Sequence, residues 1–211
     1  EDLLKGPDDA GLSEGQVYIR SIVNSLALEI QRQYVAQGRY GAKVDVSTEP
    51  EPRNRVSLDI EIDEGEVAEI KNINIVGNLS YEDEEILKGF ELKTGGWLSF
   101  FTNDNRYSRE KLKGDIESLE SYYKNRGYVE FKLDSSQVSV TPDKTSVFIT
   151  LNVDEGSTYK VNDVKIVGDL PVEEELLNSL ILIKSGEIFN QYLITETEEL
   201  FKNILGNEGY S

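Results

Sequence analysis

Carboxylates are the first candidates for chemistry in this chain. They cluster in two runs, Glu82–Glu85 and Glu173–Glu175. Paired carboxylates could act as a general acid and a general base, as in glycoside hydrolysis. Both runs stand at the same place before an apolar helical stripe, where the helix dipole favours negative charge. We therefore interpret them as helix N-termini and expect no enzymatic activity.

Other catalytic and metal chemistries lack the residues they need. The 211 residues include no Cys and no His, which removes thiolates, the commonest metal ligand and any Ser-His-Asp triad. The segment Asn103-Asp104-Asn105 lacks the glycine and the distal glutamate of an EF-hand loop. Asn78-Leu79-Ser80 matches a glycosylation sequon but falls at a predicted strand-to-helix turn. No catalytic residue, metal or cofactor is predicted.

The charge balance excludes two classes of partner. Lys and Arg total 22 against 40 Asp and Glu, for a net charge of −18. Nucleic acids and anionic membrane surfaces both need clustered basic residues. Apolar residues recur at regular spacing, which predicts a folded chain, and no apolar run approaches the roughly 18 residues of a spanning helix. The absence of Met and the start at Glu1 predict a segment of a longer protein.

The sequence repeats itself with a period of 91 residues. Ile70–Leu79 matches Val161–Leu170, and both contain a Val-Gly turn. Asp63-Glu64-Gly65 matches Asp154-Glu155-Gly156 at the same offset. A fixed period of this kind indicates tandem structural units.

Glycine spacing gives the extent of these units. Each copy has a glycine near its middle and another just before a tyrosine near the end of its second helix. These glycines are 23 residues apart in the first copy (Gly15 and Gly38) and in the third (Gly186 and Gly209), and 32 apart in the second (Gly95 and Gly127). The nine extra residues lie near Trp97–Asn105. We predict a partial unit at 1–66 that lacks its first strand, a complete unit at 67–157, and a partial unit at 158–211 that stops before its hairpin.

The middle copy predicts the order β-α-α-β-β and an α+β fold. Ile73 and Ile75 alternate with polar residues in a short strand, and Ser80 is the expected N-cap of the helix that follows. Apolar residues at steps of four and three from Leu112 to Tyr123 predict a second helix, which ends at a glycine. A hairpin completes the unit.

The first strand of that hairpin, Val129–Thr141, is the main candidate for a binding site. Its apolar residues change phase, which predicts a β-bulge in Asp134–Gln137 or, alternatively, a strand that ends near Asp134. The stretch Ser135–Thr141 carries no charge and no Pro, unlike a typical protected edge. Either a neighbouring domain covers it or it is open for β-augmentation, and we favour the second.

The inserted segment holds three large aromatic residues: Trp97, Phe100 and Phe101. They either cover the end of the local core or form an exposed patch for a partner.

Four stretches resemble a known family: Pro52–Val56, Ile73–Asn78, Leu119–Tyr128 and Ser136–Lys144. The chain resembles the POTRA domains of the BamA family of outer-membrane β-barrel assembly proteins. The resemblance would make the three units part of the second, all of the third and part of the fourth of five such domains.

This resemblance implies a three-stranded mixed sheet, in the order first-third-second, covered by two antiparallel helices. It also implies a scaffold at the periplasmic face of the bacterial outer membrane, with any membrane-embedded barrel outside this segment. The expected partners are an accessory lipoprotein such as BamB and unfolded outer-membrane protein clients, both bound by β-augmentation. The alternative is a POTRA array of a two-partner secretion or import pore that recognises a dedicated client.

The resemblance also implies a set of partner-binding residues. They are Ser136, Gln137, Val138, Ser139 and Val140 on the long strand, together with Leu92 and Lys93. Lys93 stands where the family has Arg, which weakens any bidentate contact at this position.

Overall fold

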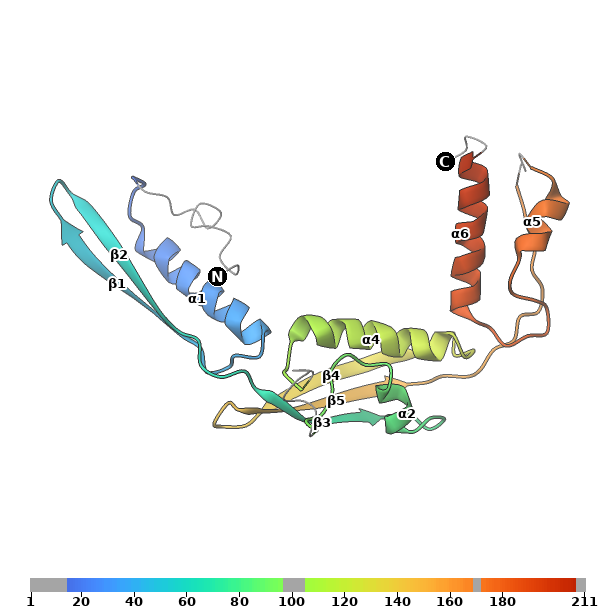
Figure 1. Cartoon of the computed structure of the whole chain (residues 1–211), viewed down its shortest axis with the longest axis horizontal. Coiled ribbons are helices and arrows are strands. Elements are labelled where there is room, and N and C mark those ends of the chain that lie inside the picture. The colour runs from blue at the N-terminus through green and yellow to red at the C-terminus, as the bar shows by residue number, and fades with distance from the viewer. Residues whose placement is uncertain (1–14, 97–104, 169–171, 208–211) are drawn as a thin grey trace. The chain divides into compact units, whose positions relative to one another are not determined.

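The structure, a computed structural model, describes residues 15–96, 105–168 and 172–207. It contains both helices and β-sheets, which confirms the α+β class (Figure 1). They are α1 Arg20–Ala36, β1 Lys43–Glu51, β2 Arg55–Asp63, β3 Glu69–Val76, α2 Asp83–Leu87, α4 Arg109–Lys124, β4 Lys132–Val140, β5 Ser146–Asp154, α5 Glu174–Leu180 and α6 Gln191–Asn207. No helix within the described ranges is long and apolar enough to cross a membrane.

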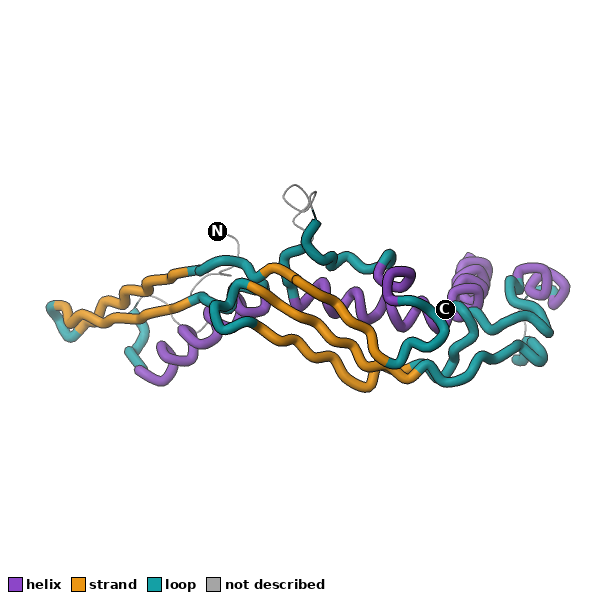
Figure 2. Tube along the Cα trace, turned by 90° about the horizontal axis from the view of Figure 1, so that it is seen from below, coloured by secondary structure: helices purple, strands orange, loops and turns teal. Residues whose placement is uncertain are grey.

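The strands form two sheets, the antiparallel hairpin β1–β2 and a three-stranded sheet in the order β3-β5-β4. Glu69 N–H donates to the carbonyl of Thr145 at 2.9 Å, and Gly77 lies against the carbonyl of Val153. Between these two contacts both strands advance by the same number of residues in the same direction, so β3 is parallel to β5. A short turn joins β4 to β5, which makes those two strands antiparallel. The mixed sheet and its predicted order are confirmed, and α4 lies along one face (Figures 1 and 2).

The predicted helical stripes are buried. On α4, Leu119 and Tyr123 are fully buried and Leu112 is 5% exposed. Ile86 of α2 and Phe90 just beyond it are also buried. Spacing of three and four residues puts such side chains on one helix face, which here packs on the sheet.

Ser80 does not cap α2, and that prediction is wrong. Its backbone N–H and its hydroxyl both donate to the carboxylate of Glu155, at 3.0 and 2.8 Å. The helix begins at Asp83, after Glu82 in extended conformation, and no side chain caps it. A buried carboxylate 75 residues away competes for the hydroxyl, because a buried charge must be hydrogen-bonded.

The described chain packs as two compact units, and β3, α4, β4 and β5 contribute to both. One unit comprises 1–73, 91–113 and 138–149, and the other 74–90, 114–137 and 150–211. This division follows packing density and does not test the sequence repeat. The three tandem units at 1–66, 67–157 and 158–211 stay a prediction.

In the first unit, the glycine that ends the α1 region contacts the start of the next repeat. The carbonyl of Gly38 accepts a hydrogen bond from Ala68 N–H at 2.9 Å. The carbonyl of Ala68 in turn accepts one from Tyr107 N–H at 3.1 Å, and the Tyr107 ring packs 5.8 Å from that of Tyr40.

In the second unit, the equivalent residues make the same connection. The carbonyl of Gly127 accepts from Tyr159 N–H at 2.8 Å, and the carbonyl of Tyr159 accepts from Phe189 N–H at 2.9 Å. The repeated sequence therefore produces a repeated local backbone geometry, although residues 161–167, which match β3, form no strand. In the described part of the chain no strand pairs with them, and only the bridge between Lys160 and Ile188 forms.

Candidate functional site

The first acidic run, Glu82–Glu85, supports local structure. Glu85 accepts a hydrogen bond of 2.6 Å from the hydroxyl of Tyr122. Asp83 accepts from Ile75 N–H at 3.1 Å and from the side chain of Asn78 at 2.6 Å. Burial, followed by the hydrogen bond to Glu85, raises the pKa of Tyr122 to about 12.

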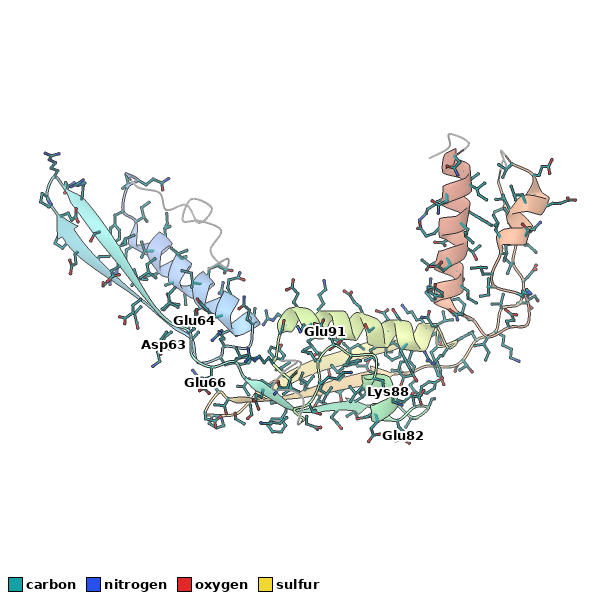
Figure 3. All side chains as sticks on the ribbon, in the orientation of Figure 1. Asp63, Glu64, Glu66, Glu82, Lys88 and Glu91 are labelled. Carbon is teal, nitrogen blue, oxygen red and sulfur yellow. The ribbon has the colours of Figure 1, made fainter. Side chains whose placement is uncertain are left out.

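Figure 3 shows the other labelled acids in similar places, with Asp63 and Glu64 where β2 ends and Glu82 beside α2. Glu64 accepts from Tyr34 at 3.2 Å and pairs with Arg39. No group of acidic side chains in the described ranges has the arrangement of a metal site. Asp83, Glu85 and Glu64 thus have structural partners, and the edge of the three-stranded sheet is the other candidate site.

The sheet order places β4 at an edge, since it hydrogen-bonds to β5 on one side only. Within the described residues no strand or isolated bridge pairs with its other side. An edge of this kind offers unpaired N–H and C=O groups to another chain.

The opposite edge, β3, is covered. Ile70 N–H donates to the carbonyl of Asn105 at 2.7 Å, and its carbonyl accepts from Gly95 N–H at 3.3 Å. Further along, the carboxylate of Asp83 accepts from Ile75 N–H. The backbone groups that β3 presents at these positions are therefore occupied, and β4 is the open edge.

β4 and β5 keep one register over the uncharged part of β4. Thr141 N–H donates to the carbonyl of Ser146 at 3.0 Å. Six residues further along each strand, the amide of Asn152 donates to the hydroxyl of Ser135 at 2.8 Å. One extra residue between these pairs would put Ser135 and Asn152 on opposite faces. The strand is therefore regular from Ser135 to Thr141.

The predicted phase change lies earlier in the strand. Phe131 is buried against Tyr123, whereas the ammonium of Lys132 lies 3.2 Å from the carboxylate of Asp154 on the other face. Ser135 also reaches that other face, three positions later. Because faces alternate every residue and Leu133 is half-buried in phase with Phe131, the shift falls after Leu133. It lies within the predicted range, 134–137.

Register decides which backbone groups of β4 face outward. Thr141 N–H points to β5, so the odd-numbered residues down to Ser135 pair with β5. The N–H and C=O groups of Ser136, Val138 and Val140 then point to the open side. Pro142, the next residue in this alternation, has no N–H, so the series of outward-pointing donors ends at Val140.

The side chains of this segment divide between the two faces. Val138 and Val140 are half-buried and stand opposite Ile149 and Val147, which are at most 1% exposed. They belong to the face that α4 covers. Gln137 and Ser139 are exposed on the other face. Ser136, two residues before Val138, is also exposed.

β1 shows how the corresponding strand of the other hairpin differs. It carries the charged residues Asp45, Glu49 and Glu51, and Pro50 interrupts its backbone donors. Charges and Pro on an edge discourage pairing with another chain. The uncharged stretch Ser135–Val140 of β4 has neither, so of these two strands β4 is the one suited to pair with another chain.

The two ends of this open edge are fixed by polar contacts. At one end, the hydrogen bond between Lys132 and Asp154 raises the pKa of Lys132 and lowers that of Asp154. At the other, Thr141 donates to Asp143 at 2.6 Å, which lowers the pKa of the Asp143 carboxyl. Thr145 N–H donates to the same carboxylate at 3.2 Å and closes the turn.

Sequence comparison assigns the family. The POTRA family, described as "Surface antigen variable number repeat", matches residues 8–65, 68–156 and 159–211. The chain belongs to the POTRA family. The BamA outer membrane protein assembly factor of Neisseria meningitidis serogroup B is 28% identical over 210 residues, which cover 99% of this chain and 26% of that protein. BamA of Buchnera aphidicola is 28% identical over 200 residues, covering 94% of this chain and 32% of that protein. The chain thus spans about a quarter to a third of these relatives.

A solved structure supports the fold of this POTRA chain. The crystal structure of Haemophilus influenzae BamA POTRA3-5 superposes with a TM-score of 0.52 at 17% identity, covering 90% of this chain and 72% of that one. At that identity the likeness concerns the fold alone.

The predicted binding residues do not all lie together in this POTRA fold. Five of them share β4, but Leu92 is 1% exposed and Lys93 is half-buried, in the segment that leads into Gly95 and the cover of β3. The aromatic residues Trp97, Phe100 and Phe101 lie outside the described residues.

Sequence reasoning missed one central residue, Glu155. Its carboxylate accepts three hydrogen bonds, two from Ser80 and one from Tyr123. The available signal was the repeat itself, because the Asp-Glu-Gly sequence occurs at both strand ends. Its first copy, Glu64, also accepts a bond from a helix tyrosine, Tyr34.

Proposed function

We propose that this chain is part of a periplasmic scaffold in the outer-membrane protein assembly machinery. Its POTRA family membership and its likeness to proteins named outer membrane protein assembly factors support that role. The single observation that carries the binding mode is the open, uncharged edge of β4. Backbone hydrogen bonds to an added strand are a general means of recognising extended segments.

Two kinds of partner fit this edge. One is an accessory lipoprotein such as BamB, and the other is an unfolded outer-membrane protein client. Both can present an extended segment to Ser136–Val140. We place the scaffold at the periplasmic face of the outer membrane. We assign it no catalytic step, since Asp83 and Glu85 of the first acidic run have structural partners and the second run stands at the start of α5.

Other predicted positions have secondary roles in this proposal. The buried Leu92 supports the local core, and the half-buried Lys93 lies in the same segment. Trp97, Phe100 and Phe101 are proposed as an additional apolar contact for a partner. Three tandem POTRA units, with the middle one complete, would present the edge.

The test replaces one outward donor. Val140→Pro removes the outward N–H without removing a bond to β5, so the fold should survive. We expect about a five- to tenfold loss of affinity for purified BamB and for an extended outer-membrane protein peptide, measured by fluorescence anisotropy, from about 1–1.5 kcal/mol for the lost bond.

The matched control is Val140→Ile, which keeps the donor and the branched apolar side chain. It should bind within about threefold of the parent, because the backbone row is intact. Circular dichroism should show the same fold for both variants. Unchanged binding of both probes by Val140→Pro would rule out strand addition at this edge.

A further inference from the structure

A second group of exposed side chains gathers at the loop Asn125–Val129, which follows α4. Four large apolar residues there are at least 41% exposed: Val129, Tyr159, Ile188 and Tyr192. Soluble proteins rarely leave a group of such side chains in water, and where they do, the group commonly binds a partner. The contacts that bring these four residues together therefore define a candidate interaction surface.

The middle of the loop holds three of them. The carbonyl of Gly127 accepts hydrogen bonds from Val129 N–H at 3.0 Å and from Tyr159 N–H at 2.8 Å. A Cβ on Gly127 would lie 2.8 Å from the Cγ2 atom of Ile188, so that side chain lies against the glycine. Residues far apart in the sequence thus reach the same short piece of backbone.

The start of α6 is tied to the same loop. The side-chain oxygen of Asn125 accepts a hydrogen bond from Tyr192 N–H at 2.8 Å. Tyr192 follows Ile188 by four residues, and both side chains are more than half exposed. All four apolar residues belong to one compact unit of the chain, 74–90, 114–137 and 150–211.

The backbone at this surface is already hydrogen-bonded. Tyr159 uses its N–H on Gly127 and its carbonyl on Phe189 N–H, at 2.9 Å. The N–H groups of Val129 and Tyr192 are also taken. An added strand would find none of these groups available, so a partner must bind here through side chains. A helix meets that condition, because its own backbone is satisfied internally.

The rim of this surface is mainly acidic. Glu130 is exposed and accepts a hydrogen bond from the Tyr159 hydroxyl, which raises the pKa of Tyr159. Glu187 is exposed beside Ile188, and the exposed Lys160 offsets one of these charges. The whole chain carries a net charge of −18, so a second copy would be repelled and a basic partner attracted.

We propose that this surface docks an amphipathic helix whose aliphatic stripe is flanked by lysine and arginine. The stripe would cover the four apolar side chains, and the flanking bases would lie near Glu130 and Glu187. Apolar residues spaced by three and four present such a stripe on one helix face. This binding site goes beyond strand addition at β4, since no backbone group of Ser136, Val138 or Val140 takes part in it.

The test uses two labelled synthetic peptides of about 18 residues, or roughly five helical turns, made of the same numbers of Leu, Lys and Ala. In one, Leu recurs at steps of three and four and forms a single stripe. In the other, the order spreads Leu around the helix. We expect the striped peptide to bind about tenfold more tightly in fluorescence anisotropy, because only it can bury its Leu side chains together.

Variants of the chain locate the binding site. Ile188→Ala combined with Tyr192→Ala should weaken binding of the striped peptide about tenfold or more, because large apolar and aromatic side chains dominate such interfaces. Both side chains are more than half exposed, so circular dichroism should be unchanged. The matched control combines Leu79→Ala and Val167→Ala, at the two repeated Val-Gly turns, which are 94% and 86% exposed. It should bind within about twofold of the parent chain.

The acidic rim is tested separately by Glu130→Gln combined with Glu187→Gln. We expect about threefold weaker binding of the striped peptide at about 50 mM salt and no difference at about 500 mM, where exposed charges are screened. The same loss at both salt concentrations would contradict the electrostatic part of the proposal.

Three results would overturn the proposed docking surface. Equal or absent binding of the two peptides would show that no stripe is recognised. Undiminished affinity in the Ile188 and Tyr192 double variant would place the helix elsewhere on the chain. Val140→Pro should leave the affinity for the striped peptide unchanged, and a loss in that variant would mean that the peptide binds at the β4 edge instead.

Discussion

Tyr123 and Glu155 form a buried hydrogen bond of 2.9 Å between the last turns of α4 and the end of β5. Tyr123 is fully buried and Glu155 is 7% exposed. The ring of Tyr123 also stacks on Phe131 at 4.3 Å, so one side chain joins the apolar core to the buried carboxylate. Tyr34 and Glu64 repeat this pair at 3.2 Å in an exposed setting.

Removing the buried hydroxyl should be costly. Tyr123→Phe keeps the ring stack but leaves Glu155 with one donor fewer, and a buried charge that loses a donor costs about 1–3 kcal/mol. Chemical denaturation monitored by circular dichroism would measure the loss in free energy of unfolding.

The repeat supplies the control for this change. Tyr34→Phe removes the same bond to Glu64, but water can replace the phenol there, and we expect about 0.5 kcal/mol or less. Equal losses from the two variants would show that burial of the Tyr123 pair adds nothing to its strength.

Alkaline pH should weaken the fold through the same cluster. Burial, with the hydrogen bond to Glu155 second, raises the pKa of Tyr123, and burial raises that of Tyr122 to about 12. The unfolded tyrosines lose their protons near their ordinary pKa of about 10, before the folded ones do. The folded state then binds more protons, so stability falls as pH rises from about 10 to 12.

Unfolding free energies at pH 8, 10 and 11 would test this slope. Tyr123→Phe removes one contributing group, so its stability should fall less steeply over the same pH interval. A parent chain with constant stability up to pH 11 would contradict the assigned pKa directions.

Local patterns predicted the helices and the sheet because their causes are local. The stripe from Leu112 to Tyr123 fixes which face of α4 is buried, and the hairpin follows from alternation on both sides of Pro142. The open edge was also predictable in outline, since the absence of charge in Ser135–Thr141 is visible in the sequence.

The details that were wrong or not located depend on distant partners. Ser80 has the type and position of an N-cap, but Glu155 takes its hydroxyl across the fold. The phase shift before Ser135 needs the pairing with Asn152 to be located. Burial of Leu92 and the cover of β3 at Ile70 likewise follow from tertiary contacts that spacing does not encode.

The repeated Val-Gly turn offers the sharpest test of the packing. Gly77 has φ of +101°, and a Cβ there would overlap the carbonyl of Val153 on β5. Backbone on a central strand cannot move away, so Gly77→Ala should cost about 3 kcal/mol or more through strain and displacement of the strand end.

Gly168 is the control, 91 residues later in the repeat. Its φ is +130°, but a Cβ would meet nothing within 4 Å. Gly168→Ala should therefore cost only the backbone strain, about 1–2 kcal/mol. Denaturant titrations of the two variants separate the contributions, because their difference measures the contact between Gly77 and Val153 alone. A loss at Gly77 no larger than that at Gly168 would mean that the end of β5 yields to the added methyl group.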